Sequence, residues 1–121
     1  MGDEREPESD LLSAEDVEEF FKGDDRTTVD YYVPEWKKTL RLRQLSAAEL
    51  GQFRQVPNGE GMALMVALSV VDAKGERVFK DHTRLQSRNA GVLDRIQDEA
   101  LKLNGLLGKA AAAMAAAAKN A

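Results

Sequence analysis

The chain lacks cysteine, has one histidine, His82, and is poor in aromatic side chains, which make up 6% of its 121 residues. The absence of cysteine excludes disulfide bonds, thiolate metal sites and a cysteine nucleophile. A single histidine excludes a multi-histidine metal site, although it leaves a Ser–His pair open. The core must therefore be aliphatic, and we expect neither a metal nor another cofactor.

Long apolar runs are also missing, because no run reaches the roughly 18 residues that a membrane-spanning helix needs. The first ten residues, MGDEREPESD, have neither the basic nor the apolar region of a secretion signal. A length of 121 residues bounds the chain at one domain plus tails. These absences favour a small cytoplasmic domain that binds other molecules over an enzyme.

Charge is distributed unevenly along the chain. Residues 1–30 carry 12 acidic and 3 basic side chains, whereas residues 31–121 carry 9 acidic and 14 basic ones. Such an acidic head keeps the chain soluble, repels other acidic surfaces, or folds back onto the basic body. If the head folds back, we expect it to dock on the hairpin face that carries Arg41 and Arg43.

Two elements are predicted in the first third of the chain. Ser13 begins a short helical pattern that ends at Gly23, and a helix this short needs a surface to dock on. Apolar and polar residues then alternate from Thr27 to Arg43, with a turn at residues 34–38. This alternation predicts a β-hairpin with one apolar face and one polar face.

Three helices are predicted after the hairpin. Ser46 and Glu49 form a capping box that starts a helix reaching about Gln55. Residues 62–71 are apolar almost all round, which favours a buried helix, with a buried strand as the alternative. After a turn at Gly75, Ser87 or Asn89 caps the last helix. Its apolar face comprises Val92, Leu93, Ile96, Ala100, Leu103 and Leu107, and Leu101 and Leu106 widen it.

These patterns divide the chain into three parts. Residues 1–26 are an acidic, partly disordered segment with a short helix, and residues 108–121 are an alanine-rich flexible tail. Residues 27–107 form a domain of the α+β class, in which an N-terminal β-hairpin packs on about three helices.

No group of side chains indicates catalysis. Adjacent carboxylates such as Glu18 and Glu19 do not face each other on a helix, and no glycine-rich loop has the pattern that binds phosphate. We interpret His82 as an exposed loop histidine, with Asp81 as a residue that would orient it if it acted. Trp36 amid basic residues is typical of a single-strand nucleic-acid binder. A solvated sheet face is favoured there, because the acidic head would compete for the same patch.

Three blocks, in order, carry a resemblance to a known family. They are Val33-Pro-Glu-Trp36 leading to Leu-Ser-Ala-Ala-Glu49, the run Val66–Asp72 followed by Gly75, and the stretch from Leu93 through Gly105. Together they cover about residues 30–107, and they resemble the tail assembly chaperones of long-tailed (siphovirus-like) bacteriophages. The acidic head and the alanine-rich tail fall outside the resemblance.

The resemblance implies a non-catalytic function in the host cytoplasm. Such chaperones coat the tape measure protein during tail assembly, are absent from the mature virion, and self-associate. In many phages a programmed frameshift yields a longer product that recruits the tail tube protein, and Gly108-Lys109 is our candidate for the slip site. A long apolar helix aggregates unless it is covered, and a groove between helices can hold an amphipathic helix.

We expect partner contacts at six residues: Trp36, Leu40, Arg41, Arg43, Leu101 and Leu106. Val92, Ile96, Leu103 and Leu107 on the last helix are further candidates, for which a core position is the alternative. Two other functions remain open from the sequence. The first is a minor structural tail or head–tail joining protein, and the second is a small nucleic-acid-binding regulator.

Overall fold

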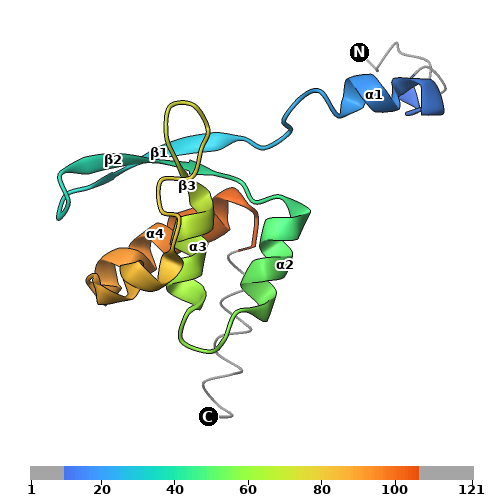
Figure 1. The fold of residues 1–121 in the computed structure, drawn as a ribbon. Coiled ribbons are helices and arrows are strands. Elements are labelled where there is room, and N and C mark those ends of the chain that lie inside the picture. The colour runs from blue at the N-terminus through green and yellow to red at the C-terminus, as the bar shows by residue number, and fades with distance from the viewer. Residues whose placement is uncertain (1–9, 107–121) are drawn as a thin grey trace, which may run out of the picture.

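A three-stranded sheet lies over a layer of helices in the computed structural model, which describes residues 10–106 (Figure 1). The α+β class expected from the sequence is confirmed. The elements are, in order, η2 (Ala14–Asp16), α1 (Val17–Phe20), β1 (Thr28–Val33), β2 (Lys38–Arg43), α2 (Ala47–Gln55), α3 (Gly61–Ser69), β3 (Val70–Val71), η3 (His82–Ser87) and α4 (Ala90–Leu103). Residues 1–9, Leu107 and the alanine-rich tail lie outside the described residues.

The β-hairpin forms where the alternation predicts it. β1 and β2 pair antiparallel, with Thr28 opposite Arg43 and Val33 opposite Lys38. Leu40 and Leu42 are buried beneath the sheet, whereas Arg41 lies on the exposed face, where its Nε is 3.0 Å from Asp30 Oδ1. The alternation therefore separates a core face from a solvated face along β2.

The apolar run after Gly61 contains a helix and a strand, which corrects the prediction of a helix over residues 62–71. α3 ends at Ser69, and Val70 and Val71 form β3, which pairs antiparallel with Leu42 and Arg41 of β2. Two β-branched residues in succession suit a strand, and the open edge of β2 supplies backbone partners that a further helical turn would not.

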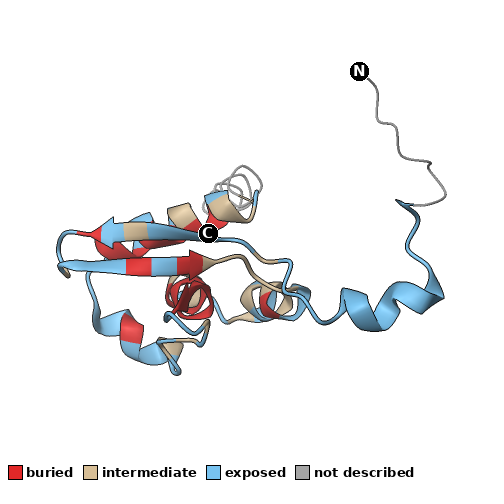
Figure 2. Ribbon diagram, turned by 90° about the horizontal axis from the view of Figure 1, so that it is seen from above, coloured by how far each residue is buried: buried red, intermediate tan, exposed pale blue. Residues whose placement is uncertain are grey.

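The helix α3 occupies the centre of the core. Its residues Ala63 to Ser69 are all buried, and the sheet, η3, α2 and α4 surround it (Figure 2). α4 presents Val92, Leu93 and Ile96 to the same cluster, which confirms the apolar face predicted for the last helix. A helix that is apolar all round must be enclosed in this way, so α3 sets the arrangement of the other elements.

Glu49 joins three segments at the end of the sheet. Its Oε1 accepts from the Ser46 backbone N–H at 2.8 Å and from Arg26 Nη1 at 3.1 Å, and its Oε2 accepts from Arg77 Nη2 at 2.7 Å. The capping box that starts α2 thus also holds the segment before β1 and the segment after β3. Only 6% of Glu49 is exposed, and its carboxylate is compensated by two guanidinium groups and one amide.

The N-terminal helical segment, residues 10–22, extends away from this domain (Figure 1). Ser13 begins it as predicted, with its backbone N–H and its hydroxyl donating to the Asp16 carboxylate at 3.0 Å each. Its large apolar side chains are all exposed: Leu11, Leu12, Val17, Phe20 and Phe21. The surface on which we expected this helix to dock is thus not supplied by the described domain of the same chain.

Replacing Glu49 should reveal how much its contacts stabilise the fold. Burial raises the pKa of the Glu49 carboxyl, but the Ser46 amide, Arg77 and Arg26 outweigh it, so the pKa lies below its ordinary value of 4.5. A lowered folded-state pKa stabilises the fold above the unfolded pKa, and this stabilisation is lost as the pH falls through both values. Glu49→Gln should lower the free energy of unfolding by about 1–3 kcal/mol near neutral pH, because two arginines lose their anion.

Urea unfolding of both proteins at several pH values measures this effect. The difference between wild type and Glu49→Gln should shrink as the pH falls below the ordinary carboxyl range, because the wild-type carboxylate, whose pKa is lowered, then becomes protonated. Asp30→Asn, which breaks an exposed pair with Arg41, is the control and should cost much less stability than Glu49→Gln. A Glu49→Gln protein as stable as wild type at neutral pH would contradict the assigned role.

Two glycines give a matched pair of opposite predictions. Gly75 has φ +83°, and a Cβ there would lie 3.4 Å from Arg43 Nη1, so Gly75→Ala should destabilise the chain by about 1–2 kcal/mol. Gly51 lies inside α2 with open space around the position of a Cβ, so Gly51→Ala should stabilise it by about 0.5–1 kcal/mol. Thermal unfolding followed by circular dichroism measures both, and shifts of the same sign would refute this assignment.

Candidate functional site

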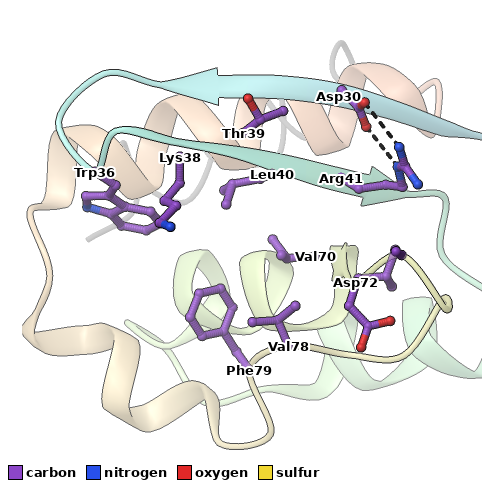
Figure 3. Close-up of a pocket in the computed structure, with 12 residues that line it drawn as sticks. Asp30, Trp36, Lys38, Thr39, Leu40, Arg41, Val70, Asp72, Val78 and Phe79 are labelled. Atoms are coloured by element: carbon purple, nitrogen blue, oxygen red, sulfur yellow. Dashed lines mark hydrogen bonds and ion pairs between the residues drawn. The ribbon is translucent and has the colours of Figure 1, made fainter.

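An apolar groove opens at the edge of the sheet, beside the N-terminal half of β2 (Figure 3). We call it the sheet-edge groove, and its volume is about 600 Å³. The hairpin contributes Trp36, Leu40 and Arg41, and the opposite wall comes from Val78 and Phe79 after β3. The remaining lining residues are Asp30, Lys38, Thr39, Val70, Val71, Asp72 and Ala73.

The groove exists because β3 is shorter than β2. β3 pairs only with Arg41 and Leu42, so on the side away from β1 the stretch of β2 from Lys38 to Leu40 has no strand beside it in the described sheet. The chain leaves β3 through a turn at Asp72–Gly75 and returns with the Val78 N–H donating to the Val70 carbonyl at 3.2 Å. This return brings Val78 and Phe79 opposite the open part of β2, where they flank the hollow (Figure 3).

The two carboxylates of the groove are engaged within the chain. Asp30 is bound to Arg41, whose hydrogen bond lowers the pKa of Asp30. Asp72 accepts from the backbone N–H groups of Glu76 and Lys74, at 3.0 and 2.8 Å, and the Glu76 bond is the largest influence that lowers its pKa. What the groove offers a ligand is therefore mainly apolar surface.

The structure brings together three of the six expected contact residues. Trp36, Leu40 and Arg41 line the sheet-edge groove, although Leu40 is largely buried. Arg43 is turned away from it, because its Nη1 donates to the Gly75 carbonyl at 2.8 Å and lies 4.0 Å from Asp24 Oδ2. Asp24 belongs to the acidic head, so this part of the head does contact the basic hairpin.

The other two expected contact residues lie in a second apolar cluster. Leu101 is 2% exposed and packs with Met65 and Ala100, while Leu106 is partly buried against the same cluster. A side chain as buried as Leu101 has little surface for a partner, so we leave it out of the site. Val92 and Ile96 are core residues, and Leu103 packs against the main core.

Sequence reasoning missed two contributors to the groove, Val78 and Phe79. They stand as a short apolar pair after the polar turn at Asp72–Gly75, and this isolated pair was the available signal. Their position against β2 depends on the length of β3, which the apolar run did not reveal. Val78 remains 49% exposed.

His82 is not the exposed loop residue that we expected. It begins η3, a turn absent from the predicted elements, and its ring Nε2 lies 2.8 Å from Glu60 Oε1. Asp81 does not orient the ring. It accepts from the Thr83 backbone N–H and hydroxyl at 3.0 and 2.6 Å, which caps η3. His82 thus fastens the start of η3 to the start of α3.

Within residues 10–106 no three His, Asp or Glu side chains gather as a metal site would require. None of the described helices is long and apolar enough to cross a membrane.

A charge placed in the groove should weaken its affinity for apolar molecules. Val78→Asp puts a carboxylate on the wall at a half-exposed position, so the fold should lose less than about 1 kcal/mol. Binding of an apolar fluorescent dye should fall at least about 10-fold, and the dye should no longer quench Trp36, the single tryptophan. Val29→Asp, at a similarly exposed valine outside the groove, is the control. Equal dye binding by both variants would refute an apolar binding groove here.

Comparisons with known proteins bear on the fold. No protein-family model matches the sequence, and no curated protein matches it. Among solved structures, the tail assembly chaperone of bacteriophage HK97 superposes with a TM-score of 0.57 at 17% sequence identity. The match covers 75% of this chain and 95% of the HK97 chain. The resemblance to tail assembly chaperones is therefore confirmed at the level of the fold: this chain is folded like the HK97 chaperone over nearly all of that protein.

Proposed function

We propose that the chain is a non-catalytic tail assembly chaperone of a long-tailed phage, which binds the tape measure protein in the host cytoplasm. The observation that carries the proposal is the fold shared with the HK97 chaperone across 95% of that chain. The three sequence blocks that resemble the family also support it.

The sheet-edge groove is the surface that we assign to the tape measure protein. A tape measure protein is long and helical, and its apolar side chains need cover until the tube surrounds it. Trp36, Val78 and Phe79 offer such cover in a hollow of about 600 Å³ at the sheet edge. One groove covers little of a long client, so many copies along it would be needed, and each contact can be weak.

Two further parts of the proposal concern assembly. Copies of the chain associate with one another along the client, as the family resemblance implies. A longer frameshifted product, extended beyond Gly108-Lys109, would recruit the tail tube protein, and the released chaperone would be absent from the mature virion. The nucleotide sequence across these two codons tests the frameshift, since a slippery heptamer must be present there.

Co-expression with the long coiled-coil protein encoded just downstream tests the main proposal. The partner should stay soluble only with this chain, and several copies should co-elute with it in light scattering. Val78→Asp should lower the amount of soluble partner several-fold, whereas Val29→Asp should not. Wild-type and Val29→Asp chains that leave the partner insoluble would overturn the proposal.

Purified phage particles provide a second readout. A chaperone should be missing from them by mass spectrometry, whereas a minor tail or head–tail joining protein should be present at a fixed copy number. Finding this chain in finished particles would replace the chaperone proposal by the structural one. Binding to DNA or RNA that weakens steeply with added salt would favour the nucleic-acid regulator instead.

A further inference from the structure

The N-terminal helical segment exposes five large apolar side chains to water. Phe20 and Phe21 are 53% and 74% exposed, and their rings touch edge to face with centroids 4.9 Å apart. Leu11, Leu12 and Val17 add to the same segment, and none of the five belongs to either core cluster. An apolar surface of this kind marks a contact with another molecule.

The segment is also acidic. Residues 14–22 contain four carboxylates and one lysine, Lys22, which pairs with Glu19 at 3.2 Å. A surface that receives this segment must therefore combine an apolar floor with a basic rim.

The chain carries such a surface at the start of η3. We call it the basic cleft, with a volume of about 570 Å³. Val78, Phe79 and Leu85 form its apolar part, and Lys80, Arg84 and Arg88 surround them. Its one carboxylate, Asp81, is engaged by Thr83. Lys80 and Arg84 interact electrostatically with Asp72 and Asp81, but within residues 10–106 neither they nor Arg88 form an ion pair within 4.0 Å. With three basic residues and one carboxylate, the cleft keeps an excess of positive charge for a ligand.

The N-terminal segment does not point toward the basic cleft of its own chain. Asp24 binds Arg26 at 3.0 Å and Arg26 binds Glu49 at 3.1 Å, which anchors the end of the segment beside α2. Both views place α1 beyond one end of the domain and residues 82–88 at the other end (Figures 1 and 2). Because the segment and the cleft lie at opposite ends of the molecule, they are suited to contact between two copies of the chain.

We propose that the N-terminal segment of one copy docks in the basic cleft of a second copy, with Phe20 and Phe21 on its apolar floor and the carboxylates facing Lys80, Arg84 and Arg88. The contact is heterologous, so a dimer keeps one free segment and one free cleft. Further copies can therefore add head to tail into a ring or an open spiral. The inference deepens the self-association contained in the proposed function by naming its interface.

Two variants, each defective in one half of the contact, test the proposal on the purified chain. Phe20→Asp with Phe21→Asp disables the N-terminal segment but leaves the basic cleft intact. Arg84→Glu with Arg88→Glu disables the basic cleft but leaves the segment intact. All four positions are exposed, so both proteins should fold. By sedimentation velocity each should associate at least about 30-fold more weakly than wild type, as expected when contacts at the centre of an interface are lost.

Mixing the two variants gives the decisive measurement. The intact segment of one fits the intact cleft of the other, so a mixture should form 1:1 dimers and nothing larger. The controls are Tyr32→Asp, an exposed aromatic on β1, and Arg54→Glu with Lys102→Glu, two basic residues on α2 and α4, and these should assemble like wild type.

A wild-type chain that stays monomeric up to about 1 mM, or variants that assemble normally, would overturn the interface. So would a mixture that yields no dimer. None of these results depends on the tape measure protein, so client solubility can be retained while this interface fails, and the reverse also holds.

Discussion

One buried carboxylate fixes where two segments of the chain join this domain. Glu49 begins α2 through its capping box with Ser46 and at the same time binds Arg26 before β1 and Arg77 after β3. These segments are 23 and 28 residues away in sequence, so a single side chain fixes both the exit of the N-terminal segment and the return of the chain after the sheet. Apolar packing around α3 encloses the core, but it is non-directional and could not specify these two positions.

Both proposed contact surfaces follow from that constraint. The segment after β3 is held at Arg77, which also forms a bridge with Val71, and from there it delivers Val78 and Phe79 to the open edge of β2. The same two residues continue into η3 and border the basic cleft. Arg26 and Asp24 hold the base of the N-terminal segment, so its apolar side chains are presented outward. A small domain thereby presents two hollows and, beyond its other end, an exposed apolar segment.

Local signals in the sequence were sufficient for the hairpin, the capping box of α2 and the apolar face of α4, because each of these depends on residues within a few positions of one another. They were insufficient at Val70 and Val71, where the backbone partners on β2 lie nearly 30 residues away and decide between helix and strand. The sheet-edge groove was not predicted, since the expected groove lay between helices. Of the residues expected to contact a partner, Trp36, Leu40 and Arg41 line it, whereas Leu101 is buried. A helical pattern shows which residues avoid water but not whether the chain itself or another molecule covers them.

The wall formed by Val78 and Phe79 borders the sheet-edge groove on one side and the basic cleft on the other. Two ligands that touch opposite sides of one wall are thermodynamically linked: if a neighbour's segment changes the affinity of the groove for a client, the client must change the affinity of the cleft for the neighbour by the same factor. A positive linkage of this kind would make chains add next to chains that are already bound, so that the client would be covered in continuous stretches and isolated subunits would be rare.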